Sequence, residues 1–213
     1  MVKIILVRHG ESFANETGTF AGQFDYKLTN RGIEQAKLTA SWLYDNYKVN
    51  AVYTSDLSRA YDTAKIIANR FGLQPVKEQG LREINSGDWQ GKGFGELKNK
   101  GDSEWNVWLS DIGNVKCLNG ESVKDLYDRV FNTVKQIIEN NEGKTVVIVS
   151  HATPIRTLCC RFKGYDVSDM KKVSWVSNSS VTEVDINGDN WVLVKESVDN
   201  YLLDLSTRFK ANV

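Results

Sequence analysis

Near its start the chain carries the stretch Ile4-Ile5-Leu6-Val7-Arg8-His9-Gly10, and the stretch Thr145-Val146-Val147-Ile148-Val149-Ser150-His151 repeats the same pattern. Each stretch is a short run of mostly β-branched apolar residues that stops at a polar turn. A run that is apolar at successive positions is typical of a strand buried on both faces, as in a parallel sheet. The sequence therefore predicts two central strands, over residues 4–7 and 145–149.

A third strand and three helices are predicted around these two strands. The apolar run 51–53 ends at a polar turn, and apolar residues recur at helical spacing over 30–44, 56–70 and 122–140. Asp56 is the expected N-cap of the second helix. Strands that alternate with helices of this length indicate βαβ units. We expect an α/β protein with three layers, α/β/α, and a mainly parallel sheet.

Two later segments depart from this alternation. Residues 85–120 hold seven glycines and three tryptophans without clear periodicity, so we interpret them as a lid insertion over the carboxyl-terminal edge of the sheet. Trp89, Trp105 and Trp108 either line a substrate mouth or pack this insertion onto the core. Further on, apolar stretches at 181–186 and 191–195 flank a turn sequence, which predicts an antiparallel hairpin at the edge of the sheet.

The length and composition limit the kind of protein. A chain of 213 residues with 41% hydrophobic and 25% charged residues is typical of one soluble globular domain, which we expect to span residues 1–213. The 27 basic residues balance the 27 acidic ones, so nucleic acid is not an expected partner. The first apolar run is too short for a signal peptide, which favours a cytoplasmic protein without a membrane partner.

The cysteines offer neither a disulfide framework nor a metal site. They are Cys117 and the adjacent pair Cys159 and Cys160, a spacing that matches neither pattern. We expect reduced and mostly buried thiols.

The chain has only two histidines, and both follow a predicted buried strand. Ligands in open α/β sheets bind beyond the carboxyl ends of the strands, which is where His9 and His151 are expected. One histidine at a strand end is commonly structural, but two out of two favour a functional site. A zinc site would need further ligands at compatible spacing, and the sequence shows none, so no metal is predicted.

Two arginines make this location suitable for binding phosphate. Arg8 directly precedes His9, and Arg59 lies near the start of the helix that follows the third predicted strand. The guanidinium group is a planar fork that matches the geometry of phosphate oxygens. The interpretation of Arg59 as a surface ion pair stays open at this point.

The residues around these positions resemble the histidine phosphatase superfamily, the phosphoglycerate-mutase-like proteins. The resemblance runs in order over roughly residues 4–155, with weaker matches at Asn178 and Ser180. Its blocks are Leu6-Val7-Arg8-His9-Gly10-Glu11-Ser12 with Asn15, then Gly22, Asp25, Leu28-Thr29, Gly32 and Gln35-Ala36, then Ser55-Asp56-Leu57-Ser58-Arg59-Ala60 with Thr63-Ala64, then Leu81-Arg82-Glu83-Ile84 with Gly87-Asp88-Trp89-Gln90-Gly91, then Gly120-Glu121-Ser122 and Val149-Ser150-His151.

The resemblance implies a role for each site residue. His9 would be the nucleophile that accepts the phosphoryl group, and Glu83 would be the general acid and then the general base. The phosphate oxygens would be surrounded by Arg8, Asn15, Arg59 and His151. A ring of arginine and imidazole donors supplies the charge stabilisation that magnesium gives in other phosphoryl transfers, so no cofactor is implied.

Three functions are compatible with these residues. We expect a metal-independent phosphomonoesterase that hydrolyses a small phosphorylated metabolite through a phosphohistidine. A phosphoglycerate mutase is the alternative within the superfamily, but residues 92–115 contain no arginine to hold a second anion. A non-catalytic module that binds a phosphorylated ligand or phosphoprotein has no need of Glu83. The sequence leaves the substrate and the oligomeric state open, and a homodimer is compatible with it.

Overall fold

The computed structural model describes residues 1–101 and 103–207 and contains a six-stranded mixed sheet. The strands follow the spatial order β3-β2-β4-β1-β5-β6. Their bounds are β1 Val2–Arg8, β2 Ala51–Thr54, β3 Pro75–Lys77, β4 Thr145–Ser150, β5 Val181–Asn187 and β6 Asn190–Val198. β1 to β4 run parallel, whereas β5 and β6 form the predicted antiparallel edge hairpin.

The two central strands are buried on both faces, as their sequences predict. In β1, Ile4 and Leu6 point into the hydrophobic cluster on one face, and Ile5 and Val7 point into the cluster on the other. β4 alternates in the same way. Side chains of a strand alternate between faces, so a continuous apolar run serves two cores at once.

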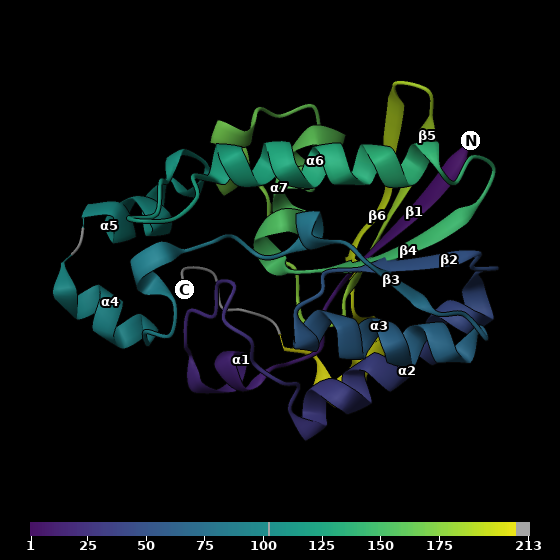
Figure 1. Ribbon diagram of the computed structural model, residues 1–213, viewed down its shortest axis with the longest axis horizontal. Helices are drawn as coiled ribbons and strands as arrows, with labels where there is room; N and C mark the ends of the chain where they lie inside the picture. Colours follow the sequence, from purple (N-terminus) through teal and green to yellow (C-terminus); the bar gives the residue numbers. More distant parts are fainter. Residues whose placement is uncertain (102, 208–213) are drawn as a thin grey trace.

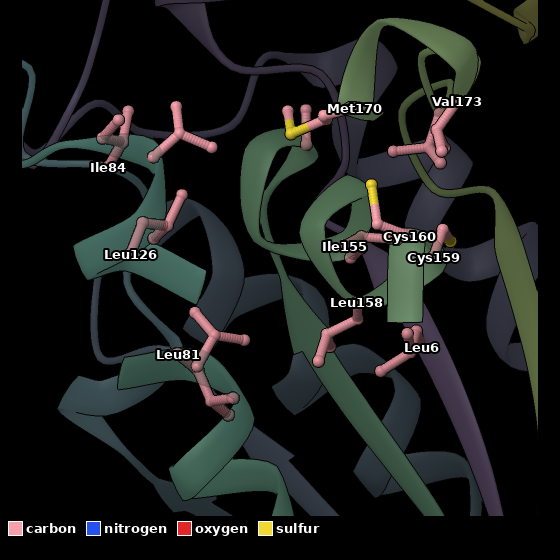
Figure 2. Packing of buried hydrophobic residues seen from close by; sticks show 14 of the residues in the cluster. Leu6, Leu81, Ile84, Leu126, Ile155, Leu158, Cys159, Cys160, Met170 and Val173 are labelled. Atoms are coloured by element: carbon pink, nitrogen blue, oxygen red, sulfur yellow. The ribbon is translucent and has the colours of Figure 1, made fainter. Parts of the chain in front are cut away.

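Helices cover both faces and make the three predicted layers (Figure 1). On one face lie α2 (Asn30–Asn46) and α3 (Ser58–Arg70), and on the other lie α6 (Val123–Glu139) and α7 (Ala152–Phe162). Figure 2 shows part of the larger cluster, to which Leu6 of β1, Leu126 of α6 and Leu158 of α7 belong along with the buried Cys159 and Cys160. All three cysteines are free and buried, as expected.

The prediction that Asp56 caps the second helix is wrong. The helix begins at Ser58 after Leu57, without a side-chain cap. The carboxylate of Asp56 instead accepts two hydrogen bonds from Arg82, at 2.6 Å and 2.5 Å. A bidentate pair with arginine is stronger than a hydrogen bond to a backbone amide, and it ties the start of α3 to the segment that carries Glu83.

Residues 85–120 form no additional strand within the described part of the chain. They contain the helices α4 (Phe94–Lys100) and α5 (Ser103–Ser110), which Figure 1 shows beyond the end of the sheet opposite the N-terminus. α1 (Phe13–Thr17) lies on the same side. Short 3₁₀ turns complete the fold at Gln79–Leu81, Gly87–Trp89, Ile112–Asn114, Val167–Lys172 and Asn200–Leu205. Among the described helices, none is long and apolar enough to span a membrane.

A close backbone crossing fixes the loop that follows β1. A Cβ atom added at Gly10 would lie 2.3 Å from the carbonyl oxygen of Gly32, and one added at Gly32 would lie 2.0 Å from that of Glu11. Only glycine lets the loop pass this close to the start of α2. The crossing holds the backbone next to His9 in place.

Candidate active site

Three neighbouring strands bring their polar ends together. Arg8 ends β1 and pairs in register with Ser150 at the end of β4, while Thr54 at the end of β2 pairs with Val149. The residues that follow, His9, Ser55 and His151, therefore gather at the carboxyl edge of the sheet. The rings of His9 and His151 lie 5.1 Å apart, centroid to centroid, in an edge-to-face arrangement.

His9 is held as a neutral imidazole with one nitrogen left for chemistry. Its Nδ1 lies 2.7 Å from the carbonyl oxygen of Gly10, and because a carbonyl only accepts, Nδ1 carries the proton. Burial lowers the pKa of His9 well below its usual value, and the charges of Arg59 and Arg8 lower it further. The lone pair therefore resides on Nε2, and the ring lines a pocket at this edge of the sheet.

Backbone carbonyls fix the two arginines in that pocket. Arg8 donates from Nη1 to Val176 at 2.7 Å, and Arg59 donates to Phe24 at 2.9 Å and to Gly22 at 2.7 Å. Burial lowers the pKa of Arg8 to about 9 and that of Arg59 to about 10, so both stay cationic at neutral pH. Two desolvated cations side by side are suited to a dianion such as phosphate.

His151 is fully buried beside His9. Its Nε2 lies 2.9 Å from Oγ of Ser55, and its Nδ1 has no hydrogen-bond partner among the described residues. Burial lowers the pKa of His151 well below its usual value, and Arg59 and His9 lower it further. A buried nitrogen without a partner is costly, which makes Nδ1 a candidate for a bound ligand.

Glu83 enters the pocket from the chain that follows the 3₁₀ turn at Gln79–Leu81. One carboxylate oxygen accepts from the backbone amide of Ile84 at 2.8 Å, and the other accepts from that of Thr153 at 3.4 Å. Desolvation raises the pKa of Glu83 above its usual value, although these bonds and the charge of Arg59 oppose the shift. The carboxyl group is thus shifted toward the protonated form that a general acid needs.

Asn15 is oriented by its neighbours. Its Oδ1 accepts from the backbone amide of Ser12 at 3.1 Å, from Ser12 Oγ at 3.0 Å and from Nδ2 of Asn178 at 3.2 Å. Because the oxygen is used in this way, the amide nitrogen of Asn15 is left to donate toward the pocket.

A single pocket collects five of the six predicted site residues. Arg8, His9, Asn15, Arg59 and Glu83 all line it. His151 lies just behind, in contact with His9 and not on the lining itself. The remaining lining residues are Ser12, Thr19, Phe20, Ala21, Gly22, Phe94, Trp108, Ala152, Thr153 and Trp175.

Comparison with known proteins agrees with this geometry. The sequence model described as histidine phosphatase superfamily (branch 1) matches residues 4–199, which is most of the chain. The chain belongs to the histidine phosphatase superfamily. It is accordingly a phosphoric monoester hydrolase, as the sequence predicts.

Curated relatives of this histidine phosphatase carry names of both phosphatases and mutases. Phosphoserine phosphatase 1 of Hydrogenobacter thermophilus is 37% identical over 79% of this chain and 79% of its own length. A metal-independent phosphoserine phosphatase of Arabidopsis thaliana is 30% identical over 91% of this chain and 80% of its own length. The phosphoglycerate mutase-like protein 4 of the same plant is 33% identical, with coverage of 90% and 83%.

Solved structures share the whole fold. YhfR of Bacillus stearothermophilus superposes with a TM-score of 0.90 at 27% identity and covers 95% of this chain and 100% of its own. A phosphoserine phosphatase of Entamoeba histolytica, solved with 3-phosphoglyceric acid, gives a TM-score of 0.82 at 30% identity, with coverage of 95% and 100%.

Sequence reasoning missed Arg129, which helps to position this histidine phosphatase's site. Arg129 of α6 donates to the backbone carbonyls of Gly80 at 2.9 Å, Arg82 at 3.1 Å and Glu83 at 3.3 Å, and its Nη2 also pairs with Glu121 at 2.8 Å. It thereby fixes the segment that presents Glu83. The three residues whose carbonyls accept from Arg129 lie 46 residues or more away along the chain. A local sequence pattern cannot predict contacts over such separations.

Proposed function

We propose that this protein is a metal-independent phosphatase that hydrolyses a small phosphomonoester through a phosphohistidine on His9. The orientation of His9 carries the proposal, because its Nδ1 proton is held by Gly10 and Nε2 remains as the nucleophile in a pocket lined by two arginines. The phosphate would lie against Arg8 and Arg59, with donors from Asn15 and His151.

The first step transfers the phosphoryl group to the enzyme. The lone pair of His9 Nε2 forms a bond to phosphorus while the ester bond to the leaving oxygen breaks. Protonated Glu83 gives its proton to that oxygen, so the alcohol leaves uncharged. The negative charge on the equatorial oxygens is balanced by the guanidinium groups, which are already desolvated and fixed.

The second step returns the enzyme to its starting state. Glu83, now a carboxylate, takes a proton from a water molecule as that water attacks phosphorus. The bond between Nε2 and phosphorus breaks, inorganic phosphate leaves, and Glu83 is protonated again. One carboxyl group thus serves as acid and then as base.

The charge of the site is supplied by arginine side chains. Among residues 1–101 and 103–207, no group of three or more histidine, cysteine, aspartate or glutamate side chains is placed to hold a metal ion.

The proposal is tested by following phosphate release from nitrophenyl phosphate and from a panel of metabolite monoesters in the presence of EDTA. Undiminished turnover supports it, whereas turnover that stops with EDTA and returns with added Mg²⁺ would overturn it.

Residues 85–120 belong to this proposal as a lid. Phe94 of α4 and Trp108 of α5 both line the pocket that holds His9. We place them over the alcohol part of the substrate, beyond the phosphate, within a single domain that spans residues 1–213.

A further inference from the structure

Part of the pocket lining is a wall of aromatic rings. Phe20, Phe94, Trp108 and Trp175 all line it, and they come from four separate segments of the chain. The rings of Phe20 and Trp108 lie 4.9 Å apart, those of Phe20 and Phe94 lie 6.0 Å apart, and those of Trp108 and Trp175 lie 6.2 Å apart, centroid to centroid. The four rings therefore form one continuous surface, which we call the aromatic wall.

Other rings and a cation hold the aromatic wall in place from behind. Trp105 stacks on Phe94 with centroids 6.1 Å apart, and Trp89 meets Trp108 edge to face at 5.9 Å. Arg156 lies over the ring of Trp175 at 4.0 Å and donates to the carbonyl of Val173, so its charge is used outside the pocket. A wall supported in this way is preorganised for a ligand.

The charged residues among the described lining are Arg8, Arg59 and Glu83. The proposed mechanism uses all three at the phosphoryl group of the substrate. The lysines of the lid segment, Lys92, Lys98, Lys100 and Lys116, do not line the pocket. A carboxylate on the alcohol part of a substrate would have to give up its water against the aromatic wall without a cation to pair with, which is unfavourable.

We infer that the alcohol part of the substrate is uncharged and apolar, with an aromatic ring or a group of similar size packed on the aromatic wall. The inference rests on the proposed phosphatase function and adds the substrate class to it. A ring stacks well on phenylalanine and tryptophan side chains. A quaternary ammonium group also binds to aromatic faces, but the described lining offers it no carboxylate besides Glu83, which the mechanism uses in its protonated form.

The test compares monoesters whose leaving alcohols are all aliphatic, so that differences in leaving-group lability are small. kcat/KM is measured for benzyl phosphate, O-phosphoserine, 3-phosphoglycerate and phosphocholine. We expect benzyl phosphate to exceed each of the other three by tenfold or more, since one well-matched apolar group is worth roughly tenfold or more in such a pocket. A ratio below tenfold for any of the three would overturn the inference.

Matched variants assign the preference to the aromatic wall. Phe94→Ala should lower the ratio of kcat/KM for benzyl phosphate to kcat/KM for 3-phosphoglycerate by about tenfold. Phe131→Ala is the control, because Phe131 of α6 packs against Trp191 of β6 and does not line the pocket. Phe94→Arg adds a planar cation and should raise kcat/KM for 3-phosphoglycerate at least tenfold. Equal effects of Phe94→Ala on both substrates, or no gain with Phe94→Arg, would contradict the assignment.

The proposed function and this inference fail in different ways. If wild-type protein hydrolyses none of the monoesters, nitrophenyl phosphate included, or if His9→Ala retains the activity, the proposed phosphatase mechanism is wrong. If hydrolysis depends on His9 but benzyl phosphate has no tenfold advantage, the mechanism stands and only the substrate class is wrong.

Discussion

Oγ of Ser55 lies 2.9 Å from Nε2 of His151 and 3.3 Å from the backbone nitrogen of Leu57, which donates to it. Among the contacts described for the Ser55 hydroxyl, Nε2 of His151 is the atom that can accept its hydrogen, so we assign the hydrogen bond as donated by Ser55. The proton of the neutral His151 ring then resides on Nδ1, the buried nitrogen without a partner among the described residues. We propose that Ser55 is a positioning residue that leaves Nδ1 of His151 as a donor for the phosphate.

Replacing Ser55 should weaken catalysis without unfolding the protein. Ser55→Ala leaves His151 free to adopt the other tautomer, and a hydrogen bond worth about 1 kcal/mol corresponds to a fall in kcat of roughly fivefold. Ser55→Cys, which keeps a weak donor, should recover part of the loss. The measurement is kcat and KM with nitrophenyl phosphate beside the Tm of each variant. A Tm shift with unchanged kcat would assign Ser55 a structural role only.

Glu83 should matter most for substrates with poor leaving groups. A nitrophenolate leaves with little help, whereas an aliphatic alkoxide needs the proton of Glu83. Glu83→Gln should therefore slow benzyl phosphate by about 10² to 10⁴ and nitrophenyl phosphate far less. The comparison uses single-turnover rates for both esters. Equal slowing of the two would remove Glu83 from the role of general acid.

The pH dependence of kcat/KM should have its plateau between the lowered pKa of His9 and the raised pKa of Glu83. The reaction needs neutral His9, whose lowered pKa keeps it neutral well into the acid range, so activity falls only once pH drops below that pKa. The reaction also needs protonated Glu83. The raised pKa of Glu83 keeps its carboxyl group protonated to higher pH, and activity falls once the pH rises above that pKa. Glu83→Gln should abolish the fall in kcat/KM at alkaline pH. Wild type and variant are compared with the same ester, so the ionisation of the ester affects both pH profiles equally. An unchanged alkaline limb in Glu83→Gln would be evidence against the assignment.

Phosphate release should dominate over isomer exchange. A mutase has to hold the distal carboxylate and second phosphate of its substrate, and the described lining of the pocket offers no cation beyond Arg8 and Arg59 for that purpose. Both reactions are followed in one tube with 3-phosphoglycerate, with and without 2,3-bisphosphoglycerate. Exchange of the 2- and 3-isomers that exceeds phosphate release by an order of magnitude would make the protein a mutase.

The sequence predicted the parts of the fold that rest on strong periodicity. The runs around Ile4 and Val146 are buried on both faces because they lie in the middle of the sheet, and their ends carry the two histidines. β3 was not predicted, since a three-residue edge strand that begins with Pro75 has no periodicity to detect. α4 and α5 also escaped prediction, because they are short and lie in a glycine-rich segment.

The aromatic wall shows the limit of sequence reasoning at the site. The choice between a substrate mouth and packing was open for the three tryptophans of the lid, and the structure divides them: Trp108 lines the pocket, whereas Trp89 and Trp105 are buried behind it. Phe20 and Trp175 join them from positions far apart in the chain. Such a surface is assembled by tertiary contacts, so a local sequence pattern cannot predict it.

The most direct measurement is rapid quenching of the wild-type protein with a substrate labelled in its phosphoryl group. We predict label that is lost in acid, stable in base, and located on Nε2 of His9, with formation faster than steady-state turnover. The variant His9→Ala should be folded, with an unchanged Tm, and should carry no label. Absence of label on the wild type at any time during turnover, or label and activity within tenfold of wild type in His9→Ala, would contradict the mechanism.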